Sequence, residues 1–129
     1  MSLLEWNNKL DVHVDSMNRE HTELIRLMNV VYDENAAASG RERISGALDA
    51  LVDYTVKHFE DEEAYMESIN FSGLKTHKYI HQDLLKRVSG FVSDYKSSTG
   101  DKLPKEFFEF LKFWLVSHIQ GIDTKYGNA

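Results

Sequence analysis

Residues 42–67, ERISGALDALVDYTVKHFEDEEAYME, decide the fold class of this chain. Core-type positions recur in them every three or four residues, and no proline or cluster of turn residues interrupts the series. This period predicts one long amphipathic helix, because residues three and four apart lie on the same helical face. The face comprises Ile44, Ala47, Leu48, Leu51, Thr55, His58, Glu62, Tyr65 and Met66. A histidine and a glutamate therefore lie on a helical face whose other residues are typical of a hydrophobic core.

Three other stretches of the chain, one before this helix and two after it, show the same spacing of apolar residues. Helices are predicted over residues 18–38, with Asn18 as the N-cap, over 74–96, and from Pro104 to about residue 126. Four helices joined by short loops predict an all-α, up-down-up-down antiparallel four-helix bundle without strands. Residues 1–17 are aperiodic, and we expect them to form an extended N-terminal arm of a single domain that spans 1–129.

Composition excludes several classes of protein. Apolar residues make up 42% of the chain and charged residues 28%, which is typical of a folded globular domain. The absence of cysteine excludes disulfide frameworks, thiolate metal sites and cysteine nucleophiles. A net charge of −6 argues against binding to nucleic acid, and the lack of a long apolar run argues against membrane insertion. The first residues lack the pattern of a signal peptide, so we expect a cytoplasmic location.

The positions of the six histidines carry more information than their number. His58 and Glu62 are four apart on one predicted helix, and a second pair of histidines has the same spacing on another, so each pair shares a face. In an antiparallel bundle the starts of the first and third helices lie beside the ends of the second and fourth. The histidines and two acids near those four helix ends therefore come to one level, and they number seven side chains. They are His21, His58, Glu62, His77, His81, His118 and Asp123. Buried imidazoles and carboxylates need partners, so this coincidence predicts a metal site.

The size of this set implies two metal ions. Five imidazoles and two carboxylates exceed the ligands that one octahedral ion accepts. If both carboxylates and one solvent oxygen bridge two ions, one position stays open for an external ligand. Imidazole and carboxylate ligands suit iron, and equally zinc, copper or nickel. Asp123 is the difficult member, because five residues separate it from His118; a local widening of the helix or a far-reaching carboxylate would be needed.

Each of these residues, taken alone, has a simpler interpretation. A single histidine on an apolar face is more often a hydrogen-bonded core residue, and His58 with Glu62 alone would suit an exposed ion pair. His13 lies in the predicted arm and is expected to be exposed. Glu60, Asp61 and Glu63 are expected to form a solvated face, from which one carboxylate could orient a ligating imidazole.

The ordered set of motifs resembles bacteriohemerythrin and the hemerythrin-like domains over nearly the whole chain. The matching pieces are NREH (18–21) with Leu24, His58-Phe59 followed by Glu62-Glu63 and Tyr65-Met66, His77 with His81, and WLVSHI (114–119) followed by DTKY (123–126). Many relatives have Asp and Gln where Asn18 and Glu20 stand, and Gly where His13 stands. None of these departures falls on a ligand position.

The resemblance implies a non-haem di-iron centre, bridged by an oxo or hydroxo group, that binds dioxygen reversibly. It implies that His77, His81 and His118 hold one iron, that His21 and His58 hold the other iron, and that Glu62 and Asp123 bridge the two. Trp114 and Leu115 match positions that line the oxygen pocket in this family.

Four functions are weighed on this basis. The first is an oxygen carrier, store or delivery protein, and the alternative is sensing or scavenging of oxygen, nitric oxide or redox state through a separate partner. A di-iron oxidase and an iron store are the others. Ferritin-like di-iron enzymes use Glu-x-x-His pairs, and no histidine here has a glutamate three residues before it. We therefore expect a protein that binds oxygen and is not an enzyme.

Overall fold

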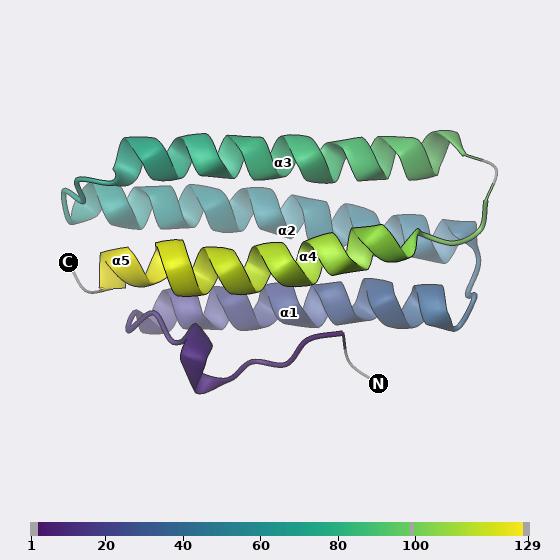
Figure 1. The fold of residues 1–129 in the computed structure, drawn as a ribbon, viewed down its shortest axis with the longest axis horizontal. Coiled ribbons are helices and arrows are strands. Elements are labelled where there is room, and N and C mark those ends of the chain that lie inside the picture. Colours follow the sequence, from purple (N-terminus) through teal and green to yellow (C-terminus); the bar gives the residue numbers. More distant parts are fainter. Residues whose placement is uncertain (1–2, 99, 128–129) are drawn as a thin grey trace.

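The computed structural model describes residues 3–98 and 100–127, and within them it confirms the predicted four-helix bundle (Figure 1). Met1, Ser2, Thr99 of the predicted turn, Asn128 and Ala129 lie outside the described residues. The elements are η1 (Asn8–Leu10), α1 (Asp15–Ala36), α2 (Arg41–Ser68), α3 (Leu74–Ser97), α4 (Lys105–His118), η2 (Ile119–Asp123) and α5 (Thr124–Gly127). The described ranges contain no strand, and none of their helices is long and apolar enough to cross a membrane.

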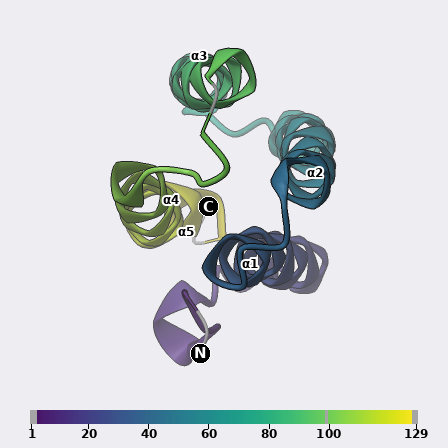
Figure 2. The ribbon, with the colours of Figure 1, turned by 90° about the vertical axis from the view of Figure 1, so that its right-hand side faces the viewer.

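The four long helices alternate in direction, and the view along their axes shows one at each corner of the bundle (Figure 2). As a result the start of α1, the end of α2, the start of α3 and the α4–α5 segment share one end of the molecule. The core between them is made of side chains from the predicted faces, including Met28, Leu48, Leu51, Phe107 and Leu111, each at most 1% exposed. This packing fixes the rotation of each helix, and with it the direction of every polar residue on the same face.

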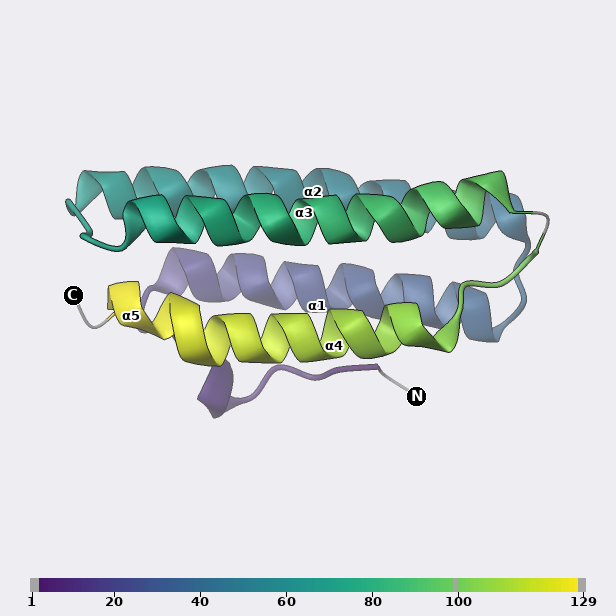
Figure 3. The ribbon, with the colours of Figure 1, turned by 45° about the horizontal axis from the view of Figure 1, so that its top comes forward.

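The N-terminal arm lies along the outside of α1 and α4 (Figure 3). Leu10 and Val12 anchor it, since both are fully buried. The side chain of Asn29 on α1 accepts hydrogen bonds from the backbone N–H groups of Leu3 and Leu4 and donates one to the carbonyl of Leu4. The arm also brings η1 against η2, the segment that carries Asp123.

The predicted start of the first helix is wrong by three residues. Helix α1 begins at Asp15, so Asn18 lies inside it and the arm ends before residue 15. The Asn18 side chain accepts a hydrogen bond from the Val12 N–H (3.0 Å) and donates one to the Asp11 carboxylate (2.8 Å). A residue type that suits an N-cap is thus used to fasten the arm, because its side chain bonds one backbone N–H and one carboxylate of the arm.

Candidate metal centre

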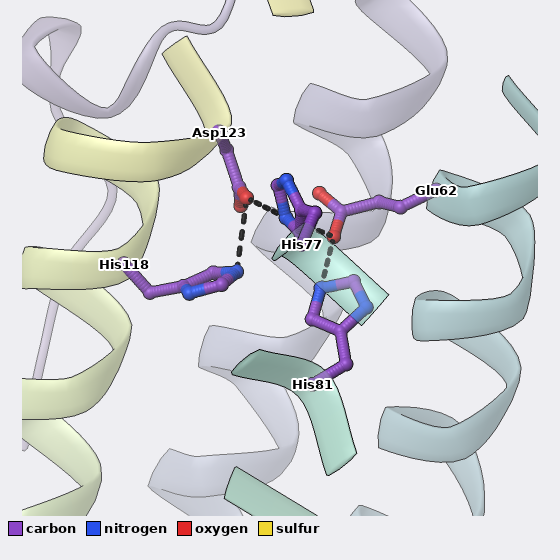
Figure 4. Close-up of side chains that lie close together, drawn as sticks. All are labelled: Glu62, His77, His81, His118 and Asp123. Carbon is purple, nitrogen blue, oxygen red and sulfur yellow. Dashed lines mark ion pairs between the residues drawn. The ribbon is translucent and has the colours of Figure 1, made fainter. Parts of the chain in front are cut away.

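The structure brings all seven candidate ligand side chains together at the shared end of the bundle. Each is at most 6% exposed, and Glu62 and Asp123 are fully buried. Figure 4 shows five of them, which reach inward from α2, α3, α4 and η2. His21 and His58 complete the set from α1 and α2. The ligand atoms form two overlapping groups, each within a 4.8 Å span, and both groups share Glu62 and Asp123.

A π-helical turn, η2, solves the spacing of His118 and Asp123. In an α-helix of 3.6 residues per turn, a five-residue step would rotate Asp123 about 140° away from His118. The i→i+5 hydrogen bonds of a π-helix instead place residues five apart on nearly the same face. Of the two solutions considered above, the structure has the local widening, and Asp123 Oδ1 lies 3.0 Å from His118 Nε2.

The first group has three imidazoles and one oxygen from each carboxylate. Asp123 Oδ1 lies 2.9 Å from His77 Nε2 and 3.0 Å from His118 Nε2. Glu62 Oε1 lies 3.1 Å from His81 Nε2 and 3.9 Å from His77 Nε2. Each imidazole in this group therefore presents the same ring nitrogen, Nε2, toward one point (Figure 4).

The second group has two imidazoles and the other oxygen of each carboxylate. His21 Nε2 lies 3.1 Å from Glu62 Oε2 and 3.1 Å from Asp123 Oδ2. His58 Nε2 lies 3.4 Å from Glu62 Oε2. Glu62 and Asp123 therefore each turn one oxygen toward the three-histidine group and the other oxygen toward the two-histidine group.

These separations suit ligands of metal ions. Two ligand atoms at about 2.1 Å from one ion, in perpendicular directions, are about 3.0 Å apart. Most of the nitrogen-to-oxygen separations above lie close to that value. The residue types also suit such a site, since imidazole and carboxylate bind iron and zinc well.

Several buried polar atoms at this centre make no hydrogen bond within the described part of the chain. They are the Nε2 atoms of His77, His81 and His118, Glu62 Oε1 and both carboxylate oxygens of Asp123. Buried polar atoms without partners are rare and cost about 1–3 kcal/mol each. So many of them around one point fit a group of positive charge that all of them would contact, which is what metal ions would supply.

Without metal, the carboxylates and imidazoles shift one another's proton affinity. Burial opposes the charged form of His58, but the neighbouring Glu62 and Glu20 carboxylates outweigh it and raise the pKa of His58 to about 9. Burial and the charge of Glu62 oppose ionisation of Asp123, yet the surrounding imidazoles lower the pKa of Asp123 to about 2. Burial likewise opposes ionisation of Glu62, and the imidazoles around it hold its pKa well below the ordinary value.

These directions predict how the metal-free protein depends on pH. The stabilisation from His58 is complete below its ordinary pKa of 6.5 and is lost as the pH rises through about 9. The stabilisation from Asp123 is complete above its ordinary pKa of 3.8 and is lost as the pH falls through about 2. We expect the midpoint of urea unfolding of the metal-free protein to fall between pH 6.5 and 9. A midpoint that rises across this interval would contradict the raised pKa of His58. The metal-loaded protein is the control.

Sequence reasoning missed two polar residues of the centre and left a third among alternatives. The hydroxyl of Tyr126, which is 1% exposed, donates a hydrogen bond to Glu62 Oε2 at 2.7 Å. Glu20 lies 2.7 Å from the outer nitrogen of His58, and Glu63 lies 2.9 Å from that of His81. Tyr126 stands in a matching motif, and Glu20 stands in another at a position where many relatives have Gln; these positions were the only signal in the sequence for either residue. Of the three acids expected on a solvated face, Glu63 is the one that contacts an imidazole.

The two predicted pocket residues are both buried, at 5% exposure for Trp114 and 2% for Leu115. Trp114 packs edge-on against Phe59, which in turn stacks flat on His81 with ring centroids 3.8 Å apart. Trp114 also lines a cleft of about 290 Å³ between α3 and α4, and this cleft reaches His118. Leu115 is not among the residues that line this cleft.

Comparisons with known proteins agree with this geometry. The model of the hemerythrin HHE cation-binding domain matches residues 12–129. A bacteriohemerythrin of Stenotrophomonas maltophilia is 29% identical over 99% of this chain and 82% of its own length. A myohemerythrin of Riftia pachyptila is 34% identical over 94% of this chain and 88% of its own length. A crystal structure of wild-type hemerythrin superposes with a TM-score of 0.90 at 26% identity, covering 98% of this chain and 97% of that chain.

Proposed function

Since the chain belongs to the hemerythrin family, we propose that its buried centre holds two iron ions and binds dioxygen reversibly. The observation that carries this proposal is that the two oxygens of each carboxylate face different ligand groups. Each of Glu62 and Asp123 directs one oxygen to the three-histidine group and the other oxygen to the two-histidine group. Carboxylates so placed suit a bridging role between two neighbouring ions.

In this proposal, His77, His81 and His118 hold one ion, and His21 and His58 hold the other. Both ions share Glu62 and Asp123, and an oxo or hydroxo group completes the bridge. The two-histidine position has one protein ligand fewer, so it is the position that would accept an external ligand. Residues 1–129 would act as one domain, because the arm supports η2 and all four helices contribute a ligand.

The chain's own residues favour binding over catalysis. Iron ions in the centre would supply the electrons that a bound oxygen molecule needs for reversible attachment. Five neutral imidazoles and two carboxylates make a nitrogen-rich set, which disfavours the highly oxidised metal that O–O cleavage requires. Phe59, Trp114 and Leu115 are buried apolar side chains at this end of the bundle. We therefore propose an oxygen-binding protein that is not an enzyme, with Trp114 and Leu115 beside the bound gas; no feature of the described residues favours the sensing alternative.

One spectral series tests the proposed function. The iron-loaded protein is reduced without air, exposed to oxygen and then purged with argon. We expect a visible absorption band that appears with oxygen and disappears on purging, over several cycles. A spectrum that changes once and cannot be reset by purging would contradict reversible binding and favour an oxidase. Zinc-loaded protein is the control, because zinc has no redox chemistry.

A further inference from the structure

Two imidazoles of the centre, one in each ligand group, have a carboxylate within hydrogen-bond distance of the ring nitrogen that faces away from the centre. Glu20 Oε1 on α1 lies 2.7 Å from His58 Nδ1, in the two-histidine group. Glu63 Oε2 on α2 lies 2.9 Å from His81 Nδ1, in the three-histidine group. A carboxylate accepts hydrogen bonds, so in each pair the neutral imidazole carries its proton on Nδ1, and its Nε2 is then free to bind a metal ion.

The other three histidines lack this arrangement. No Asp or Glu oxygen in the described part of the chain lies within 4.0 Å of their Nδ1 atoms; their ion pairs all involve Nε2. The Nδ1 atom of His21 is buried and makes no hydrogen bond there. The side chains of Glu20 and Glu63 are 16% and 25% exposed, so solvent screens these two contacts only in part.

We propose that Glu20 and Glu63 are positioning residues that act through the imidazoles, each for a different metal position. A carboxylate that accepts the Nδ1 proton fixes the orientation of the ring and increases the basicity of Nε2. Glu20 would strengthen metal binding at the two-histidine position, and Glu63 would strengthen it at the three-histidine position. This inference rests on the ligand groups of the proposed function, but it does not depend on the metal being iron or on oxygen binding.

Zinc binding to the metal-free protein tests the inference by calorimetric titration. Glu20→Gln and Glu63→Gln keep the length of the side chain and an acceptor oxygen, and they remove the charge. The unmodified protein is expected to bind zinc in two steps. Each single variant is expected to weaken one step by about 10–100-fold and to leave the other unchanged, and the double variant is expected to weaken both. Glu60→Gln is the matched control, because Glu60 lies exposed on α2 and is not among the carboxylates that pair with His58 or His81.

A spectroscopic signature separates this role from a general loss of structure. In the zinc-loaded protein, the Nδ1–H proton of an imidazole bonded to a carboxylate should resonate far downfield by nuclear magnetic resonance. We expect one such resonance to move upfield in Glu20→Gln and a different one to move in Glu63→Gln, with the helical circular dichroism of the metal-free variants unchanged.

Two results would overturn the inference. The first is that both variants bind zinc within twofold of the unmodified protein. The second is that either single variant weakens both steps equally. If the unmodified chain bound no zinc, the ligand groups would be wrong and the inference would fall with them. If zinc behaved as expected and oxygen binding to the iron-loaded protein failed, only the proposed function would be lost.

Discussion

Glu62→Ala is expected to abolish binding of both metal ions, whereas His118→Ala is expected to spare one of them. Glu62 belongs to both ligand groups, and its two oxygens face opposite sides of the centre. Removing it deletes a ligand from each position, and it also leaves Tyr126 and His21 without their buried acceptor. His118 belongs to the three-histidine group alone. The measurement is iron per chain by elemental analysis after loading and desalting.

Two controls make this result interpretable. Glu60→Ala removes an exposed glutamate from the same helix and should retain the iron content of the unmodified protein. Circular dichroism of the metal-free Glu62→Ala protein reports whether the bundle still forms. A folded Glu62→Ala protein with unchanged iron content would show that Glu62 does not join the two positions.

Removal of the metal is expected to lower the thermal unfolding midpoint by at least about 10 °C. A ligand at about 1,000 times its dissociation constant stabilises a protein by about 4 kcal/mol, and in a domain of this size each kcal/mol shifts the midpoint by several degrees. The physical origin lies in the buried atoms without hydrogen bonds, since Asp123 and three imidazoles would regain partners when metal binds. Calorimetry of loaded and chelator-treated protein gives the shift.

His13→Asn is the matched variant for this measurement. His13 is the one histidine outside the centre, and its backbone has a positive φ of 62°, which asparagine tolerates well. The variant should show the same shift on metal removal as the unmodified protein. A shift of less than about 2 °C in the unmodified protein would mean that the centre is already satisfied without metal.

Much of the centre could be predicted because helical period and topology act together. The four-residue spacings placed His58 with Glu62 and His77 with His81, and the antiparallel order placed those pairs at one end. The extents of α2 and α3 followed from their apolar faces and agree with the prediction to within one residue at either end.

Other features depend on tertiary contacts and backbone hydrogen bonds, which the spacing of apolar residues does not reveal. Asn18 suits an N-cap, but tertiary contacts with the arm decided its use and moved the helix start to Asp15. The choice between a widened helix and a reaching carboxylate at Asp123 depends on backbone hydrogen bonds, which spacing alone does not fix. Tyr126 became recognisable as a partner of Glu62 only once the phase of the last helical turns was known.

The π-helical turn makes the centre depend on the backbone hydrogen-bond pattern at a place where two neighbouring residues are exposed. Gln120 and Gly121 are exposed, and a Cβ added at Gly121 would meet no atom within 4 Å. The i→i+5 backbone hydrogen bonds there are constrained, however, because they set the angle at which Asp123 and then Tyr126 leave the helix axis. If the same residues formed an ordinary α-helix, Asp123 would turn about 140° away from His118, and the hydroxyl of Tyr126 would no longer be held at Glu62. The backbone hydrogen bonds of η2 are therefore part of the site, although the side chain of Gln120 is not.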